Sequence, residues 1–365
     1  MRYDAIIIGS GPAGSTAGYY LAKAGLKVLT IEKTTFPRYC IGESLLPYNM
    51  EIFRDMGFDQ KLEQAQFMVK HGAIFGSSTG KIINRIDFSK GIESAYSYAY
   101  QVPRAQFDDL LAQHAKENGV ETLHSAVIDL VMDEDRVCGV KVRASDTAEE
   151  QILESRVVID ASGRRFFIAK KFNLLVPDPQ INSVAVFGLF QNIPWLPEAR
   201  KGDIMILAFN EGWFWFIPFS DGRVSVGVVT DMKFYNRYIE DPIQNFFNMM
   251  VNRAGGRVCE VMKEAVSLEE MNLLQQFSKH ASRKSGPGWV LVGDAAMFVD
   301  PVYSAGVLMA MTGGREVAQL TLEAFKKGEK VNATTYAPFE EKLANGYKTV
   351  LPFIYHFRKP FFQKI

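Results

Sequence analysis

Three glycines near the start of the chain have the spacing of a phosphate-binding turn. Gly9, Gly11 and Gly14 follow an apolar run, Ala5–Ile8, in the order GxGxxG. In such a turn the first glycine permits a tight bend, the second lets the backbone approach a pyrophosphate, and the third lets the next helix pack closely on the strand. That helix would direct unpaired N–H groups and the positive end of its dipole at the phosphates. The candidate phosphate-binding residues are Gly9, Ser10, Gly11, Pro12, Ala13 and Gly14.

An acidic residue completes this first motif. Glu32 ends a second apolar run, Val28–Ile31, at a place where a carboxylate can accept hydrogen bonds from ribose hydroxyls. Strand, glycine turn, helix, strand and acid occur in the order that predicts nucleotide binding, with a purely structural glycine turn as the alternative. The acid favours FAD or NAD over NADP. The motif leaves the choice between FAD and NAD open.

Two distant segments have the same general form. RVVIDASGRR (156–165) is an apolar strand that runs into a tight turn at Asp160–Gly163. GWVLVGDAAMFVDPVYSAGV (288–307) is another apolar strand, ending at Gly293 and Asp294, with a helical stretch from about Gly306. Taken alone, each is equally well a structural junction between a strand and a helix.

The aromatic segment GWFWFIPF (212–219) is expected to be a strand. Because side chains alternate along a strand, its aromatic rings face both ways. One set is Trp213, Trp215 and Ile217, and the other is Phe214, Phe216 and Pro218. A central core strand buried on both faces explains this pattern, and so does a wall between two compartments. A buried tryptophan also needs a partner for its indole N–H.

Composition limits the class of protein. The chain has 365 residues with 41 basic and 41 acidic side chains, a balance that gives no support for a nucleic-acid partner. Cys40, Cys138 and Cys259 are odd in number and far apart, which argues against disulfides and against a zinc site, so we expect no metal. We find no signal peptide and no apolar run of about 18 residues, so we expect a cytoplasmic protein without a transmembrane segment.

Two lobes must position these motifs, because one hydrophobic core rarely grows beyond about 250–300 residues. We expect a discontinuous nucleotide-binding lobe made of residues 1–65, 101–170 and 280–330. Residues 66–100 and 171–279 would form the substrate lobe, and residues 331–365 a helical tail. The substrate lobe is predicted to hold strands at Ala73–Phe75, Lys81–Ile86, Ala95–Tyr100, Ser183–Gln191, Asp203–Phe209, Trp213–Pro218 and Arg223–Thr230, followed by one amphipathic helix over Asp241–Lys263. The aromatic and basic end of the tail (351–365) either packs on the body or contacts a membrane surface or partner.

The three nucleotide-type motifs, in this order over essentially the whole chain, resemble the FAD-dependent monooxygenases of the para-hydroxybenzoate hydroxylase fold. The resemblance implies an α/β flavoprotein with a Rossmann-like FAD-binding lobe and an antiparallel β-sheet substrate lobe. It implies that Asp294 holds the ribityl chain, that Arg104 faces the flavin and that Val127 lies in the strand passing the adenine. The other cofactor-binding candidates are Lys33, Arg38, Ser44, Asp160, Gly163, Gly293, Pro301 and Gly306.

Four shorter motifs resemble the flavin-dependent halogenases. They are W-x-W-x-I-P at 213–218, FPRxxxGESLLP at 36–47, a lysine, Lys70, before a Gly-Ala pair, and D-P-x-x-S-x-G at 300–306. The resemblance implies that a C4a-hydroperoxyflavin oxidises a halide held at Ser304, Ala305 and Gly306. The oxidised halogen would then travel to Lys70, while Trp213 and Trp215 separate the flavin from an electron-rich aromatic substrate.

Two departures keep other functions open. Tyr303 stands where tryptophan halogenases carry a glutamate, which argues against tryptophan as the substrate. Halogenases also usually continue beyond the equivalent of Ile365. Geranylgeranyl reductases resemble the chain in a similar aromatic strand, so a reductase of isoprenoid or lipid double bonds is one alternative, and a non-catalytic flavin-binding module is another. Because no second dinucleotide motif is present, NAD(P)H would bind transiently or a partner flavin reductase would supply reduced flavin.

Overall fold

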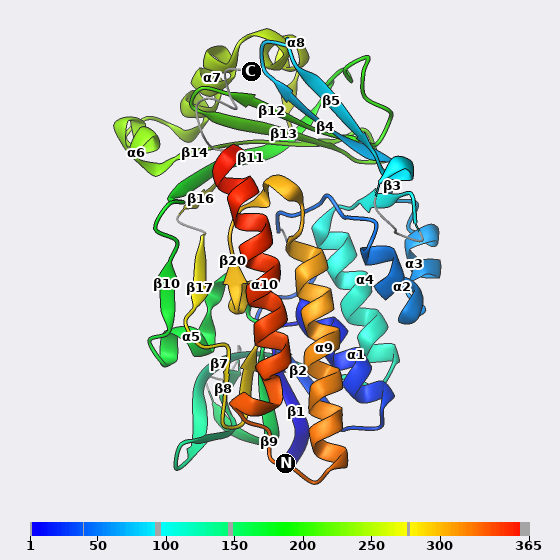
Figure 1. The fold of residues 1–365 in the computed structure, drawn as a ribbon, viewed down its shortest axis with the longest axis vertical. Coiled ribbons are helices and arrows are strands. Elements are labelled where there is room, and N and C mark those ends of the chain that lie inside the picture. The colour runs from blue at the N-terminus through cyan, green and yellow to red at the C-terminus, as the bar shows by residue number, and fades with distance from the viewer. Residues whose placement is uncertain (1, 39, 92–95, 145–148, 276–277, 358–365) are drawn as a thin grey trace.

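Two lobes, each built on its own sheet, lie one above the other (Figure 1). The structure is a computed structural model that describes residues 2–38, 40–91, 96–144, 149–275 and 278–357. The lower lobe holds both the N-terminal strand and the N-terminal part of the last helix. The upper lobe holds the sheet that contains the aromatic segment.

The lower sheet has a parallel centre in the spatial order β7-β2-β1-β9-β19. In its register Ile8 lies opposite Asp160, and Asp160 lies opposite Leu291. The turns that follow these strands therefore meet at one edge of the sheet, which brings the three nucleotide-type motifs together. The strands are β1 (Arg2–Ile8), β2 (Val28–Glu32), β7 (Glu121–Asp133), β8 (Arg136–Ala144), β9 (Glu150–Asp160), β18 (Ser285–Gly286) and β19 (Trp289–Leu291).

Helices of the lower lobe pack side by side over this sheet (Figure 1). A Cβ atom at Gly314 would lie 2.5 Å from the Ala13 carbonyl oxygen, so glycine is needed where α9 crosses α1. The prediction that a helix begins at about Gly306 is confirmed, because α9 starts at that residue. The helices are α1 (Pro12–Lys23), α2 (Asn49–Asp55), α3 (Asp59–Gln64), α4 (Arg104–Glu117), α5 (Phe167–Lys171), α9 (Gly306–Lys326) and α10 (Ala333–Phe357).

The upper sheet runs in the order β15-β11-β14-β13-β12-β4-β5, with β16 also paired to β11. Its neighbours are antiparallel except for the parallel pair β12 and β4. The four strands expected between residues 183 and 230 are confirmed, with bounds shifted by a residue at most. The strands are β4 (Gly72–Ser77), β5 (Ile83–Asp87), β11 (Ser183–Gln191), β12 (Ile204–Phe209), β13 (Gly212–Pro218), β14 (Val224–Asp231), β15 (Val266–Ser267) and β16 (Asn272–Gln275).

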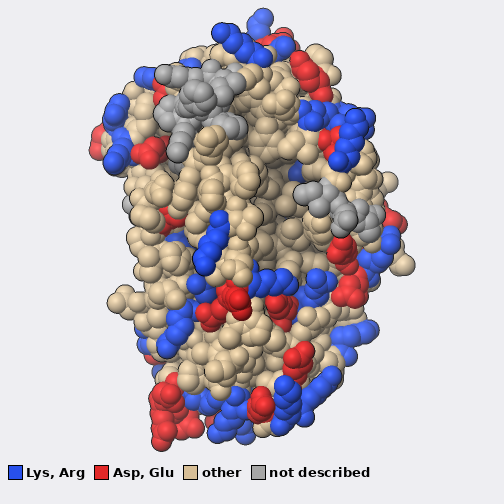
Figure 2. Space-filling model, viewed as in Figure 1, with Lys and Arg blue, Asp and Glu red and all other residues tan. Residues whose placement is uncertain are grey.

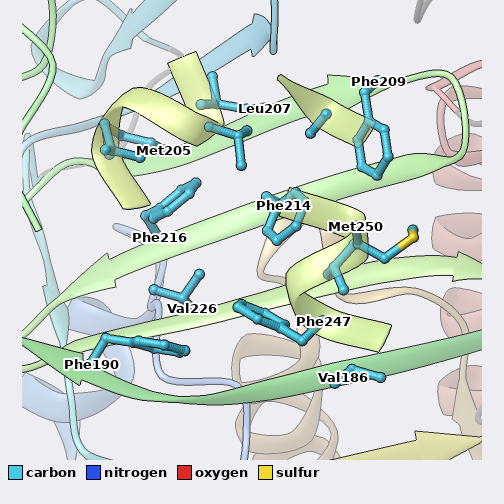
Figure 3. Packing of buried hydrophobic residues seen from close by; sticks show 14 of the residues in the cluster. Val186, Phe190, Met205, Leu207, Phe209, Phe214, Phe216, Val226, Phe247 and Met250 are labelled. Atoms are coloured by element: carbon cyan, nitrogen blue, oxygen red, sulfur yellow. The ribbon is translucent and has the colours of Figure 1, made fainter. Parts of the chain in front are cut away.

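Strand β13 is buried on both faces, and the two faces have different neighbours. Phe214 and Phe216 point to the outer face, where they pack with Phe247 and Met250 (Figure 3). This is an ordinary hydrophobic core under the helices of the upper lobe. Trp213 and Trp215 share the opposite face with residues of the interlobe region. The interpretation of the segment as a core strand thus describes the face with Phe214 and Phe216. The face with Trp213 and Trp215 is the one that could form a wall between two compartments.

The helix expected over Asp241–Lys263 is wrong as a single element. The structure has α7 (Ile243–Ala254) and α8 (Gly256–Met262), which meet at Gly255. Gly255 has φ +60° and Gly256 has φ +43°, values that end an α-helix and that glycine adopts readily. A short helix, α6 (Met232–Tyr235), and a 3₁₀ turn that follows it precede α7.

Smaller sheets connect the lobes. Strand β3 (Met68–Lys70) pairs with β6 (Ala99–Gln101), which is shorter than the strand expected from Ala95, a residue outside the described part. Strand β17 (Lys279–Ala281) lies between β10 (Leu175–Pro177) and β20 (Met297–Phe298). This three-stranded sheet joins segments from both predicted lobes. The exact lobe boundaries stay a prediction.

Candidate active site

The glycine turn after β1 has no room for side chains. Gly9 has φ +100°, and a Cβ there would lie 2.6 Å from the Ala161 carbonyl oxygen. A Cβ at Gly14 would lie 2.0 Å from the carbonyl oxygen of Gly9. At Gly11 the nearest group is instead a guanidinium nitrogen of Arg38, at 3.2 Å. The turn therefore packs against β9 on one side and faces a cationic side chain on the other.

Glu32 is buried at the end of β2 and organises the same turn. Its two carboxylate oxygens accept hydrogen bonds from the backbone N–H groups of Ser10 and Thr34, each at 3.1 Å. Each carboxylate oxygen can accept more than one hydrogen bond, so acceptor capacity remains for a ribose. The next residue, Lys33, is exposed.

A buried carboxylate holds two arginines beside the turn. Arg104 donates to both oxygens of Asp108, at 2.7 and 3.0 Å, and to the carbonyl oxygen of Ile41, at 2.8 Å. Arg38 lies 3.6 Å from the same carboxylate. Within the described residues, the buried Nε of Arg38 and Nη1 of Arg164 have no hydrogen-bond partner. Buried donors without partners are costly unless an anionic group satisfies them.

The two aspartates of the distant motifs differ. Asp160 is fully buried, and its oxygens accept from the N–H groups of Ser162 (2.9 Å) and Ile168 (2.7 Å), so it shapes its own turn. Asp294 is only half-buried at the turn after β19. Burial raises its pKa to about 6, against the opposing effect of Arg164 and Arg104. Gly163 and Gly293, with φ +59° and +62°, form the two turns.

These features fit FAD. The crowded glycine turn, the unpartnered guanidinium donors and the Glu32 carboxylate suit an adenosine diphosphate, and Asp294 at the neighbouring turn suits the hydroxyls of the ribityl chain. Val127, in β7, is buried in the hydrophobic core of the lower lobe, with 7% of its surface exposed. On the face shown in Figure 2 the surface is hollowed between the upper sheet and the helices of the lower lobe.

The start of α9 borders this hollow region. A 3₁₀ turn at Pro301–Tyr303 is capped by Asp300, which accepts from the N–H of Val302 at 3.0 Å. Ser304 then adopts φ +56°, and α9 begins at Gly306. The first N–H groups of a helix have no acceptor within the helix and favour an anion. Ser304 and Ala305 are half-buried and Gly306 is exposed.

The two tryptophans of β13 belong to the same hydrophobic cluster as Val302, so the aromatic strand and the segment before α9 pack together. Trp215 donates its indole N–H to the hydroxyl of Ser225 at 3.1 Å. Trp213 is 3% exposed, and its indole N–H finds no acceptor in the described part of the chain. Phe357, at the end of α10, lies edge-on to Trp213 with ring centroids 6.3 Å apart.

Lys70 is buried, with 1% of its surface exposed. Its ammonium donates to the hydroxyl of Ser44 at 2.8 Å and to the carbonyl oxygen of Leu45 at 2.9 Å. Burial lowers the pKa of Lys70 to about 7, with Asp203 acting in the opposite direction. The lysine is therefore joined to the GESLLP segment, and it is available as a neutral amine near neutral pH.

Several residues of the site were missed in the sequence. Asp108 had a signal, because it stands four residues after Arg104 on a helix, where the two side chains meet. Glu43 had one too, since it lies inside GESLLP. Arg164 had a signal as well, since it lies in the motif RVVIDASGRR. Ser225 had none, because it meets Trp215 only through the pairing of β13 with β14.

Other classes of site are not supported. The described residues contain no group of three or more His, Cys, Asp or Glu side chains placed to bind a metal ion. Among the helices described, none is both long enough and apolar enough to cross a membrane. The basic and aromatic end of the chain, which was considered for membrane or partner contact, lies partly outside the described residues, from 358 onward.

Comparison with known proteins gives consistent relatives. A family model described as FAD binding domain matches residues 2–338. The chain is 28% identical to the 1H-pyrrole-2-carbonyl-(peptidyl-carrier protein) chlorinase of Pseudomonas fluorescens, over 96% of this chain and 82% of the relative. It is 30% identical to the corresponding brominase of Pseudoalteromonas luteoviolacea, over 88% of this chain and 78% of the relative.

Comparison with solved structures points to the same family as the sequence relatives. The myxobacterial chondrochloren halogenase, described as a variant of FAD-dependent halogenases, superposes with a TM-score of 0.90 and 32% identity. The match covers 97% of this chain and 82% of that one. The expected α/β fold with an FAD-binding lobe is confirmed. The reductase and the non-catalytic module are not favoured by these relatives.

Proposed function

The chain belongs to the FAD-binding flavoproteins and, among them, to the flavin-dependent halogenases, and from this premise we propose that it halogenates an electron-rich aromatic compound through Lys70. It is an FAD-dependent oxidoreductase. The overall reaction is ArH + X⁻ + H⁺ + O₂ + FADH₂ → ArX + FAD + 2 H₂O. When bound, reduced FAD would supply two of the four electrons that reduce O₂ to two water molecules, and the halide supplies the other two.

The chain's own residues would hold the cofactor and the halide. The turn at Gly9–Gly14, Arg38 and Glu32 bind the adenosine diphosphate end, and Asp294 binds the ribityl hydroxyls. The amides at Ser304–Gly306 favour a halide anion, because helix N-terminal N–H groups carry partial positive charge. Arg104 fixes the segment 41–45 through the Ile41 carbonyl oxygen and keeps it beside this site.

The observation that carries the proposal is the buried amine of Lys70. A lysine whose two acceptors are a hydroxyl and a carbonyl oxygen has no structural need for a charge. Its lowered pKa leaves a substantial fraction of neutral amine near pH 7, which can take up an electrophilic halogen. The segment that accepts these bonds, GESLLP, is held at its first residue by Arg104, which donates to the carbonyl oxygens of Ile41 and Gly42.

The aromatic wall supports halogenation over hydroxylation. Trp213 and Trp215 are almost fully buried between the upper sheet and the segment before α9. Packed indoles exclude water, which protects an oxidised halogen from hydrolysis. They would also keep the substrate away from the flavin.

The substrate is proposed to be a phenol-like or pyrrole-like ring. Three aromatic rings pack against one another next to Trp213, with centroids 6.0 to 6.4 Å apart. They belong to Phe75, Tyr303 and Phe357. Such a lining favours a flat aromatic ring. Both curated relatives act on a pyrrole carried by a protein, so carrier-bound substrates belong in the test. A separate flavin reductase is the proposed source of reduced FAD.

Product analysis tests this function. The full chain is supplied with reduced FAD, oxygen and a panel of free and carrier-bound phenols and pyrroles, with and without bromide. We expect a brominated product, recognised by the isotope pair of bromine, only when bromide is present. An oxygenated product that forms equally without bromide would replace halogenation by hydroxylation, and reduced double bonds in an isoprenoid panel would replace it by reduction.

A further inference from the structure

We propose that Asp178 is a positioning residue that fastens the last turn of α10 over the aromatic rings beside Trp213, and so sets the size of ring that the substrate space accepts. The carboxylate acts through the hydroxyls of Tyr347 and Tyr355. The inference deepens the proposed halogenation and rests on it. It concerns a buried carboxylate and two phenols to which the reaction itself assigns no role.

The two carboxylate oxygens of Asp178 hold different parts of the molecule. Asp178 stands directly after β10 and is 8% exposed. Its Oδ1 accepts from the backbone N–H groups of Gln180 at 2.8 Å and Ile181 at 2.9 Å. Its Oδ2 accepts from the hydroxyls of Tyr355 at 2.9 Å and Tyr347 at 3.4 Å, both on α10. One oxygen therefore holds its own turn, and the other holds the helix.

The turn at Asp178 is itself fixed beside the tryptophans. Ile181 is 3% exposed and belongs to the same hydrophobic cluster as Trp213 and Trp215. The backbone N–H of Asp178 donates at 3.1 Å to the carbonyl oxygen of Ser278, the residue before β17. This bond joins the turn to the three-stranded sheet between the lobes. Asp178 thus fastens α10 to a part of the molecule that already contacts the wall.

The end of α10 forms part of the substrate space. The helix runs from the lower lobe to the upper sheet (Figure 1). Ile354 and Phe357 are 4% and 5% exposed and belong to the cluster that contains the tryptophans, whereas the neighbouring Phe353 is 64% exposed. Because Phe357 lies edge-on to Trp213, a shift of this last turn changes the space beside the wall.

A proline weakens the hold of the helix on its own last turn. Pro352 lies inside α10 and has no N–H to donate to the carbonyl oxygen of Lys348, four residues earlier. The helix therefore attaches its end with one hydrogen bond fewer. Tyr347 precedes the proline and Tyr355 follows it, so Asp178 bridges this weak point from outside the helix.

Both phenols remain hydrogen-bond donors at neutral pH. Burial is the main cause that raises the pKa of Tyr355, to about 12, and Asp178 adds to it. The same two causes raise the pKa of Tyr347. Hydrogen bonds from neutral donors to a carboxylate are stronger than those between two neutral groups. Loss of one hydroxyl, with its ring left in place, is therefore enough to loosen the last turn.

Amide hydrogen exchange tests this fastening without any turnover. The FAD-loaded chain is compared as wild type and Tyr355→Phe, which lacks one hydroxyl and keeps the ring. We expect the amides of residues 353–357 to exchange about tenfold faster in the variant, the factor for one hydrogen bond to a charged acceptor, with exchange in α9 unchanged. Equal exchange at the end of α10 in the two proteins would overturn the proposal.

Substrate size is the second readout. KM and kcat are measured for bromination of phenol and of naphthol. A larger ring needs the loosened end of α10, and apparent affinity follows the fraction of the competent conformation, so KM for naphthol is expected to fall about tenfold relative to phenol in Tyr355→Phe. We expect kcat and flavin reoxidation to change by less than about twofold. An unchanged ratio of the two KM values would overturn the proposal, whatever happens to kcat.

Tyr336→Phe is the matched control. Tyr336 is fully buried near the opposite end of α10, and its hydroxyl lies 2.8 Å from the hydroxyl of Thr321. This variant loses the same atom from the same helix. It is expected to lower thermal stability and to leave the ratio of KM values at the wild-type level. Equal shifts of that ratio in Tyr336→Phe and Tyr355→Phe would show a general effect of helix packing and would contradict a role for Asp178.

Variants of Asp178 test the other partner. Asp178→Asn keeps an oxygen for the turn and offers N–H donors to the phenol oxygens, so its KM ratio is expected to stay near wild type. Asp178→Ala is expected to lower the ratio at least as far as Tyr355→Phe. If both residues act through one bond, Asp178→Ala/Tyr355→Phe is no worse than Asp178→Ala, and multiplied effects would overturn the link.

The exchange measurement separates this proposal from the proposed function. A wild type that binds FAD and consumes oxygen, but forms no halogenated product from any ring of the panel, defeats the proposed halogenation. Faster exchange confined to the end of α10 in Tyr355→Phe would support the fastening by Asp178 in that case as well.

Discussion

The buried position of Lys70 makes its charged form energetically unfavourable in the folded protein. In the unfolded chain a lysine titrates near pH 10.4, whereas burial lowers the pKa of Lys70 to about 7 in the folded chain. Between these values the unfolded state binds more protons, so the free energy of unfolding rises with pH. Below about pH 7 both states are protonated and the full cost of the buried charge is present.

Lys70→Met should therefore stabilise the protein most at low pH. The methionine keeps the length of the side chain and removes the titrating group. The gain in unfolding free energy over wild type is expected to be about 2–3 kcal/mol smaller at pH 9 than at pH 6. Urea unfolding at both pH values measures it, with the exposed Lys81→Met as control. A gain that does not change with pH would show that Lys70 titrates normally.

Glu32 affects cofactor affinity at the opposite end of the site. Glu32→Ala removes the ribose acceptor and the two bonds to the N–H groups of Ser10 and Thr34. FAD binding is expected to weaken by about 1–3 kcal/mol, the range for hydrogen bonds to a charged group. Titration of flavin fluorescence measures the affinity, and Glu341→Ala, on the exposed side of α10, is the control. Unchanged affinity would remove Glu32 from the binding site.

Among the elements, the paired strands β13 and β14 set the positions of Trp213 and Trp215, the two side chains of the proposed wall. Gly227→Ala places a methyl group where the Trp215 ring lies, so the indole or the strand must shift. We expect a loss of about 1–3 kcal/mol in unfolding free energy, the usual cost of overpacking, and lower coupling of halogenation to flavin oxidation.

Gly188→Ala is the control for that change. It lies on β11 in the same sheet, and its Cβ would meet the flexible side chain of Met271 at 3.0 Å. Methionine can move aside, so coupling is expected to stay near wild type. Equal coupling in both glycine variants would contradict a role for the position of Trp215.

The end of α10 bears on substrate choice. Phe357 packs against Trp213, Phe75 and Tyr303. Phe357→Ala is expected to open space beside these rings and to lower KM for bulkier aromatic substrates, with flavin reoxidation unchanged. Phe353→Ala, on the same helix but 64% exposed, is the control. Steady-state kinetics over a size series of phenols measures the effect, and identical KM values in both variants would place the substrate elsewhere.

At the scale of the whole molecule, the features that could be predicted were local ones. The glycine turn, the strands of the upper sheet and the start of α9 each have a sequence signal within a few residues. Gly255 and Gly256, at the junction of α7 and α8, are also visible in the sequence, but the hydrophobic periodicity continues across them and hides the break. The convergence of the Gly9, Asp160 and Asp294 turns follows from the parallel order of the strands, which the resemblance implied.

Contacts between distant strands could not be predicted in this way. Ser225 meets Trp215 because β13 and β14 pair in one particular register, in which Trp215 lies opposite Gly227. Arg85 likewise donates to the carboxylate of Asp203 at 2.7 Å, although the two residues stand 118 positions apart in the chain. Neither pairing leaves a local pattern, since a buried serine in a strand looks like any small residue. Such contacts require the three-dimensional structure.

The central claim is that halogenation passes through Lys70 after the oxidant has formed elsewhere. The most direct measurement follows reduced FAD and bromide in wild type and Lys70→Met in parallel, recording flavin reoxidation by absorbance and brominated product by mass spectrometry. We predict equal reoxidation rates within about twofold and a loss of product of about 100-fold or more in the variant, the scale of removing a reacting group. Brominated product at the wild-type level in Lys70→Met would contradict the claim.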